Sequence, residues 1–215
     1  MRIEKISPRR KNLVAIKFSS SPKLDLSGAL YEGENLLIDR EILARLSLCE
    51  GEELSETEVQ QLVATSECYR AKQRAVWYLS SGDMSEKGLY QKLCRTFTPA
   101  AAAFAVEQMI KKGYLKELNF ARRLLRQGKD KNLSKRAIKN KLFEKGISPE
   151  VMQEVLEEWN EGDVSSLCQL LETKYATRLS GEDFPKTVAA LQRRGFSYAD
   201  IKTALIRLHQ DEELW

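Results

Sequence analysis

One pattern of residues recurs along the chain at intervals of roughly fifty residues, and such self-similarity is typical of proteins built from repeats. The matching segments are 84–109, 133–159 and 183–208. In the first segment Leu89 and Leu93 stand four positions apart, and in the second segment Ile138 and Leu142 do the same. This spacing places both apolar side chains on one face of a helix. Because no convincing strand pattern follows residue 54, we expect the repeats to be helical.

Each repeat also contains signals for a turn between two helices. Gly146 and Gly195 follow a helical pattern, where glycine readily adopts the left-handed conformation that ends a helix. Thr98 and Ser148 are each followed by a proline. A hydroxyl group at the N-cap and a proline at the first helical position both favour the start of a helix. We therefore expect the order helix, turn, helix within a repeat.

A further helix is expected before each matching segment, which makes three helices in a repeat and about nine in all. Ser55 and Glu58 form a capping-box pattern that opens the helix leading into the first repeat. The expected parts are 1–54 with a β-hairpin and an acidic linker, 55–118 as helical repeat 1, 119–160 as helical repeat 2 and 161–215 as helical repeat 3. One three-helix unit has little core of its own, so neighbouring units should stack into an elongated, curved body. The fold class expected is mainly α.

The N-terminal part differs from the rest because it contains short runs of β-forming residues. Residues 2–6 and 13–18 are two such runs, and the polar residues between them indicate a hairpin. A third short strand is expected at 36–38. Asp39 then stands as the N-cap of a short helix. The apolar residues on one face of that helix are Ile42, Leu43 and Leu46.

Charge is distributed unevenly along the chain, although the formal net charge is only +4. Between residues 111 and 145 lysine and arginine far outnumber the acidic residues, which are Glu117, Asp130 and Glu144. A run of charge is usually a solvated helix face. So much like charge repels itself, however, unless an anionic partner offsets it. We therefore interpret this block as a surface for such a partner.

Short motifs in the repeats match those of a known family. They are Ala75, Tyr78-Leu79, Ser85, Leu89, Leu93, Gly113-Tyr114-Leu115, Phe120-Ala121, Lys145-Gly146-Ile147, Arg193-Arg194-Gly195-Phe196-Ser197-Tyr198 and Ile201. On these residues the chain resembles the RecX family over about 68–209. It departs from the family's pattern at Glu117, where an aspartate is commoner, at Asn132-Leu133, where a glycine is often found, and at Gly82, where a basic residue is common.

The resemblance implies a function as well as a fold. It implies a non-enzymatic protein that lies in the helical groove of the RecA filament on single-stranded DNA. Such a protein lowers strand exchange and the filament's ATP hydrolysis, in the regulation of DNA repair and recombination. The implied partners are the RecA filament and single-stranded DNA, contacted directly or through the filament.

The residues expected to meet this partner form a basic face of the second repeat that continues into the third. They are Arg122, Arg123, Arg126, Lys129, Lys131, Lys135, Arg136, Lys139, Arg193 and Arg194. The alternative is that about half of them merely lie on solvated helix faces and contact no partner. The aromatic residues Tyr114, Phe120, Trp159 and Phe196 fall at apolar positions, so we expect them to pack in the core. Sequence-specific readout of bases is therefore not expected.

An enzyme is not expected, and neither is a cofactor or a metal site. The one histidine, His209, is interpreted as a helix-end residue, and the sequence has no glycine-rich phosphate loop. Cys49, Cys68, Cys94 and Cys168 are scattered without a CxxC spacing, so we expect buried, reduced thiols rather than zinc ligands.

The setting expected for the chain is the cytoplasm, as a monomer. Its first residues do not look like a signal peptide, and no apolar run is long enough to cross a bilayer. The main alternative function is that of a freestanding, non-specific DNA-binding helical protein. Short helices separated by turns also occur in helix-turn-helix proteins, and the basic block could contact phosphates directly.

Overall fold

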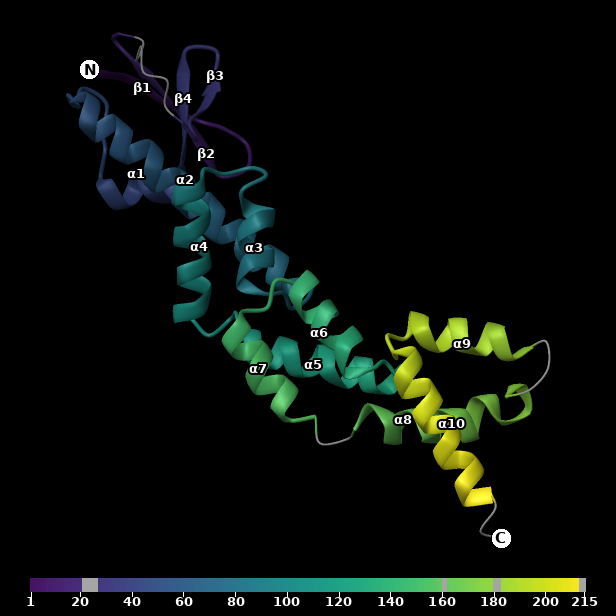
Figure 1. The fold of residues 1–215 in the computed structure, drawn as a ribbon. Helices are drawn as coiled ribbons and strands as arrows, with labels where there is room; N and C mark the ends of the chain where they lie inside the picture. Colours follow the sequence, from purple (N-terminus) through teal and green to yellow (C-terminus); the bar gives the residue numbers. More distant parts are fainter. Residues whose placement is uncertain (21–26, 160–161, 180–182, 213–215) are drawn as a thin grey trace. The chain divides into compact units, whose positions relative to one another are not determined.

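The computed structural model describes residues 1–20, 27–159, 162–179 and 183–212. It divides into two compact units, Met1–Leu115 and Lys116–Trp215, and each is described by itself. Figure 1 shows a small antiparallel sheet at the N-terminus followed by helices, so the mainly α fold with tandem three-helix groups is confirmed. No helix within the described ranges is long and apolar enough to span a membrane.

The first unit opens with a four-stranded antiparallel sheet in the order β1-β2-β4-β3. The strands are β1 (Ile3–Pro8), β2 (Leu13–Phe18), β3 (Leu30–Glu32) and β4 (Asn35–Asp39). The hairpin expected from the sequence is confirmed as β1 and β2, and the third expected strand is β4. Strand β3 was missed because its three residues are all exposed and so show no alternation of apolar and polar residues.

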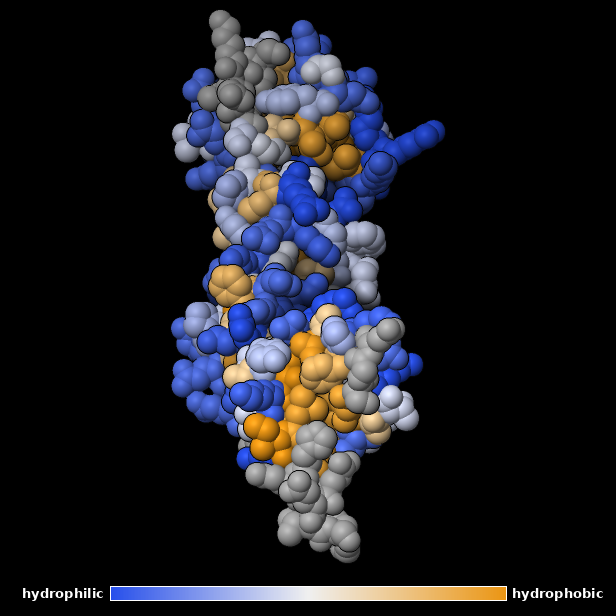
Figure 2. Space-filling model, turned by 45° about the vertical axis from the view of Figure 1, so that its right-hand side comes forward, coloured by the Kyte–Doolittle hydropathy of each residue, from blue (hydrophilic) through white to orange (hydrophobic). Residues whose placement is uncertain are grey.

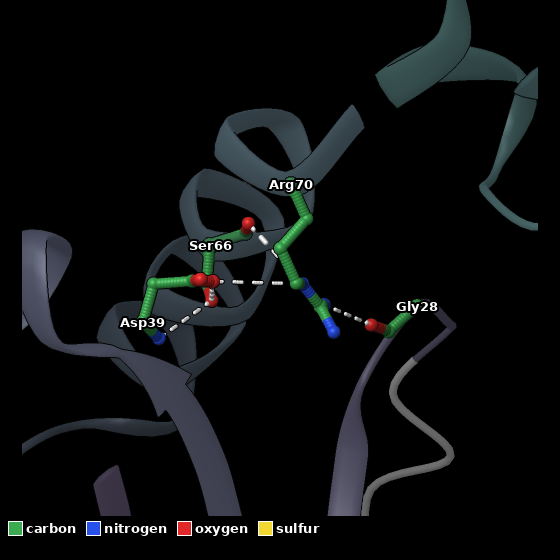
Figure 3. A network of polar contacts seen from close by, with 4 residues as sticks. All are labelled: Gly28, Asp39, Ser66 and Arg70. Carbon is green, nitrogen blue, oxygen red and sulfur yellow. Dashed lines mark hydrogen bonds and ion pairs between the residues drawn. The ribbon is translucent and has the colours of Figure 1, made fainter. Parts of the chain in front are cut away.

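The short helix α1 (Arg40–Leu46) begins directly after Asp39, as expected. The expectation for the Asp39 side chain is wrong, however, because its carboxylate does not cap α1. It accepts a hydrogen bond of 2.8 Å from the Ser66 hydroxyl on α2 (Glu56–Ser80), and the Asp39 amide donates to the same hydroxyl at 3.2 Å (Figure 3). The expected apolar face is correct for Ile42, which is buried, whereas Leu46 is exposed.

Arg70, one turn further along α2, completes this network (Figure 3). Its guanidinium Nε lies 3.6 Å from the Asp39 carboxylate, and its Nη2 donates to the Gly28 carbonyl at 2.9 Å. Burial raises the pKa of Asp39, and the Ser66 hydrogen bond and the Arg70 charge offset only part of that rise. Burial likewise lowers the pKa of Arg70. The network therefore joins the sheet to α2 at a cost in desolvation of both charges.

We expect Arg70→Met to destabilise the protein by about 2 kcal/mol at about pH 7.5, because the buried Asp39 carboxylate loses its counter-charge. Without Arg70 the pKa of folded Asp39 rises further above its value in the unfolded chain. The penalty is therefore absent below the unfolded pKa and develops as the pH rises through the folded pKa, so the loss of stability should be smaller at about pH 4.5. Urea unfolding at both pH values measures this difference.

The matched control for this prediction is the double substitution Asp39→Asn and Arg70→Met. It removes the carboxylate that titrates, so its loss of stability should vary little between the two pH values. A single Arg70→Met variant whose loss is the same at both pH values would show that the Asp39 charge does not depend on Arg70.

The first unit ends in the three-helix group α2, α3 (Glu86–Leu93) and α4 (Pro99–Lys111). The capping box of Ser55 and Glu58 is confirmed at the start of α2. Leu89 and Leu93 are fully buried, as their spacing indicated. They pack against small side chains of α2 and α4, chiefly Ala71, Ala75, Ala101, Ala102 and Ala105. The alanines allow α2 and α4 to pack closely, which holds α2 in place under the sheet.

The second unit contains two further groups of helices. The first has α5 (Glu117–Asp130), α6 (Lys135–Glu144) and α7 (Pro149–Glu157). The second has α8 (Asp163–Leu170), a π-helical turn (Leu171–Tyr175), a 3-10 turn (Ala176–Arg178), α9 (Phe184–Arg193) and α10 (Tyr198–Glu212). Ile138 and Leu142 are fully buried, and Gly146 and Gly195 have φ values of +72° and +92°, so the expected helix ends are confirmed. His209 lies in the last turns of α10.

Two expectations about burial need correction. Cys49 is exposed, and the other three cysteines are only half-buried at the edges of the hydrophobic cores. Phe120, Trp159 and Phe196 are buried as expected, but Tyr114 is 58% exposed because it belongs to the turn after α4. Figure 2 shows that hydrophilic side chains cover most of the face drawn and that apolar ones gather over part of each unit.

Candidate nucleic-acid interface

The predicted basic residues of α5 differ in the partners that they have within the protein. The Arg122 guanidinium is paired with two carboxylates, that of Glu158 directly after α7 at 2.7 Å and that of Glu154 on α7 at 3.3 Å. Its charge is therefore largely offset within the molecule. Arg126 lies on the side of α5 opposite the buried residues and is exposed. Of these two arginines, Arg126 is thus the better placed to meet an external anion.

Two more cations of the predicted face lie over aromatic rings. The Lys129 ammonium is 5.1 Å from the centre of the buried Trp159 ring, and the Arg123 guanidinium is 5.4 Å from the centre of the Phe120 ring. These contacts stabilise the group α5 to α7 from within, because a cation is attracted to the face of an aromatic ring. Lys131 follows α5 and is exposed. The cations of α5 therefore have a role in packing, in addition to any contact that they make with a partner.

A groove of about 910 Å³ brings two of the remaining predicted cations together across two repeats. It lies between α6 and the turn that joins α9 to α10, and we call it the α6–α9 groove. The polar and aromatic residues that line it include Arg136, Asn140, Lys141, Lys145, Arg193 and Tyr198, with Glu144 as the acid. Arg136 and Arg193 come from different repeats and were both predicted. Phosphate groups favour such a concentration of positive charge, because binding releases counterions.

Hydrogen bonds hold the start of α6 against the last group of helices. The Ser134 amide, just before α6, donates to the Arg194 carbonyl at 3.0 Å, and the Lys135 amide donates to the Asp163 carboxylate at 2.8 Å. A Cβ atom on Gly195 would lie 2.6 Å from the Cβ of Ala137, which is closer than real Cβ contacts allow. The glycine therefore permits the α9–α10 turn to lie directly against α6.

Three predicted residues lie apart from this groove. The Arg194 guanidinium donates to the Tyr175 hydroxyl at 2.6 Å and lies over the same ring. Lys135 and Lys139 instead border a second, more apolar groove of about 520 Å³ between α6 and α7. Its other lining residues include Phe143, which is 71% exposed. The predicted face thus divides between α5, the α6–α9 groove and the α6–α7 groove.

Sequence reasoning missed three residues of the α6–α9 groove as site residues. Lys141 and Lys145 are four positions apart, but Lys141 stands five positions after Arg136, so the period of the helix does not group them with Arg136. Tyr198 is 62% exposed at the start of α10. Nothing in the sequence near Tyr198 distinguishes it from a core aromatic residue. An exposed aromatic ring among cations is an arrangement on which unpaired bases can stack.

No group of three or more histidine, cysteine, aspartate or glutamate side chains in the described parts of the chain could hold a metal ion. The α6–α9 groove is lined by cations, an amide, a serine hydroxyl and an exposed aromatic ring, with Glu144 as the acid. Cations and amides can bind phosphates, and an exposed aromatic ring can stack bases.

Comparison with known proteins finds that the helical groups are similar to those of one family. The family model described as "RecX, second three-helix domain" matches residues 117–156, which run from α5 into α7. The regulatory protein RecX of Caldanaerobacter subterraneus is 28% identical over 194 residues, which cover 88% of this chain and 95% of that protein. The regulatory protein RecX of Clostridioides difficile is 25% identical over 183 residues, which cover 83% of this chain and 86% of that protein.

The regulatory protein RecX of Listeria monocytogenes serotype 4a is 30% identical over 135 residues, 60% of this chain. The match spans about half of that relative, 49% of its length. A crystal structure of a regulatory protein RecX has a TM-score of 0.63 at 19% identity, covering 94% of this chain and 98% of its own. A crystal structure of RecX from Lactobacillus salivarius has a TM-score of 0.57 at 22% identity, covering 68% of this chain and 99% of its own. The two structures share the fold.

The second three-helix group, which carries most of the basic block, is the part that the family model matches. The relatives from Caldanaerobacter and Clostridioides extend the similarity over most of the chain. The family model, these relatives and the shared fold agree: the chain is similar to the regulatory proteins RecX over most of its length and has their fold.

Proposed function

We propose that this protein binds in the groove of the RecA filament on single-stranded DNA and lowers strand exchange and ATP hydrolysis. It would thereby regulate DNA repair and recombination without chemistry of its own. The observation that carries the proposal is the α6–α9 groove, in which Arg136 of one repeat and Arg193 of the next line one positively charged recess. The similarity of the chain to regulatory proteins RecX supports it.

The two grooves of the second unit suit a partner that has both phosphates and protein surface. The α6–α9 groove offers cations, whereas the α6–α7 groove offers Met152 and Leu156 beside two lysines. A nucleoprotein filament presents both kinds of surface, and contacts made at several points add to a higher overall affinity. We propose that the protein acts in this way as a monomer in the cytoplasm, where DNA-bound filaments would form.

We expect the protein to bind RecA-coated single strands about tenfold more tightly than bare strands at about 0.15 M salt, a difference of about 1.4 kcal/mol. The reason is that apolar and protein contacts persist at a salt concentration that weakens phosphate contacts. A pelleting assay with RecA, an ATP analogue and single-stranded DNA measures the difference. An ATPase assay on the same filaments should show inhibition at the concentrations that give binding.

The second candidate function is that of a freestanding, non-specific DNA-binding protein. It is favoured by the exposed Tyr198 among the cations of the α6–α9 groove, since this arrangement needs no RecA to bind a strand. In that case bare DNA should bind at least as tightly as coated DNA. The affinity should then fall steeply with salt, by about 0.7 log units for each contact and each log unit of salt.

A further inference from the structure

A second arrangement of exposed aromatic rings and cations lies in the first unit, far in sequence from the basic block. Trp77, on the last turns of α2, is 56% exposed. The Arg74 guanidinium lies 5.4 Å from the centre of its ring, and the Tyr78 ring lies beside it with centroids 5.2 Å apart. Tryptophan carries much apolar surface, so leaving one half-exposed is costly unless the ring meets a partner.

Trp77 borders a pocket of about 770 Å³, which we call the Trp77 pocket. This volume is in the usual range for small-molecule sites. The pocket is lined by α2, by the segment around Gly28, by the turn between β1 and β2, and by the turn before α4. The lining residues that face an incoming ligand include Lys11, Leu13, Ala29, Arg74, Trp77 and Phe97. Apolar and aromatic groups thus form much of the surface, with cations beside them.

The acids of the Trp77 pocket are occupied by partners within the protein. Both carboxylate oxygens of Glu67 accept hydrogen bonds of 2.7 Å from Thr98, one from its amide and one from its hydroxyl. Asp39 is bound by Ser66 and lies beside Arg70, as described above. Lys11 and Arg74 are both exposed. The pocket therefore offers an anionic ligand two exposed cations, while its carboxylates are held by internal donors.

The backbone at Lys11 gives an independent reason to connect its side chain with binding. Lys11 and Asn12 form the centre of the hairpin turn with φ values of +58° and +61°. Glycine or asparagine adopts this conformation at least cost, whereas lysine is strained in it. Strained residues concentrate at binding sites, where the side chain compensates for the strain. Lys11 therefore places a positive charge at the Trp77 pocket at some cost to the turn.

We propose that the Trp77 pocket binds one base of a single-stranded nucleic acid, stacked on Trp77, with the flanking phosphates held by Lys11 and Arg74. Stacking on an exposed ring accepts any base, because every base has a flat apolar face. The cations at the pocket match the phosphates of the strand in sign. This contact is separate from the α6–α9 groove and does not depend on RecA.

The test uses the intact protein and a short, labelled oligodeoxythymidylate in the absence of RecA. Trp77→Ala is expected to weaken binding by about tenfold, toward the lower end of what loss of one stacked base costs. The slope of affinity against salt should not change, because stacking releases no counterions. Trp77→Phe keeps an aromatic ring and should stay within about threefold of the unchanged protein.

Tryptophan emission provides a readout that a purely structural role would not affect. The oligonucleotide should quench part of the emission of the unchanged protein, and the quenching should disappear in Trp77→Phe, which still binds. Trp159 serves as an internal reference, since it is buried in the core of the second unit. Quenching that persists in Trp77→Phe, or Trp77→Ala affinity equal to that of the unchanged protein, would overturn the proposal.

Lys11→Gly separates binding from stability. It should raise the melting temperature, because glycine relieves the strain of the turn, and it should lower the salt slope by about 0.7 through loss of one phosphate contact. An unchanged slope would show that Lys11 does not contact the strand.

If RecA alone changes the Trp77 emission and the oligonucleotide does not, the pocket binds a protein segment and the proposal is wrong. None of these assays uses RecA-coated DNA. Their results therefore test the Trp77 pocket even if the protein does not bind the RecA filament.

Discussion

Replacing Gly195 by alanine is expected to destabilise the second unit by about 3 kcal/mol and to disrupt the α6–α9 groove. The added Cβ would lie 2.5 Å from the Ser134 hydroxyl and 3.2 Å from the Cα of Ala137. These atoms belong to the start of α6, where the Ser134 hydroxyl accepts a hydrogen bond from the Ala137 amide. They cannot move without displacing the helix. The φ value of +92° adds strain of about 1 kcal/mol for any side chain.

Gly33→Ala is the matched control for this prediction. Gly33 also has a positive φ, +60°, but a Cβ atom there would meet nothing within 4 Å. Its substitution should therefore cost only the backbone strain, about 1 kcal/mol. Urea unfolding of both variants measures the difference, with the transitions of the two units analysed separately. Equal losses in the two variants would mean that the α9–α10 turn does not pack against α6 as closely as described.

Replacing Arg136, Lys141 and Arg193 together by alanine is expected to weaken binding to bare single-stranded DNA by about a hundredfold at low salt. All three side chains line the α6–α9 groove, and Arg136 and Arg193 are exposed. Each phosphate contact on a single strand contributes about 0.7 to the slope of log affinity against log salt, so the slope should fall by about 2. A salt titration with a labelled oligonucleotide measures both quantities.

A control with the same change in net charge distinguishes the groove from the overall charge of the protein. Arg9, Lys17 and Arg45 are surface cations of the first unit, paired with Glu32, Glu4 and Glu41. Their replacement by alanine should change affinity by at most about threefold and leave the slope nearly unchanged, because their charge is offset within the molecule. If this control loses as much affinity as the groove variant, the groove has no special role in binding.

Most of the fold could be predicted because its signals are local. The capping box of Ser55 and Glu58 acts within one turn of helix, and the spacing of Leu89 and Leu93 defines one face of a helix. Strand β3 could not be predicted, since its three exposed residues form a strand only through pairing with β4. The Asp39 side chain was assigned to the wrong partner for a similar reason. Its actual partner, Ser66, is 27 residues away in the sequence.

The candidate site could be predicted only in part. Composition placed the positive charge between residues 111 and 145, but it could not separate cations with internal partners from cations that a ligand can reach. Arg122 pairs with Glu154 and Glu158 within its own repeat, whereas Arg136 shares a groove with Arg193 of the next repeat. Lys141 and Tyr198 could be assigned to the site only from the tertiary structure, which places both in the α6–α9 groove.

The sequence by itself determined where most helices begin and end and which faces they bury, because caps, glycine turns and the helical period act between near neighbours. The tertiary structure alone decided which cations point into one recess, which are paired internally, and that Trp77 stands half-exposed at a pocket. The physical reason is that electrostatic pairing and solvent access depend on distances in space, and these join residues that are far apart along the chain.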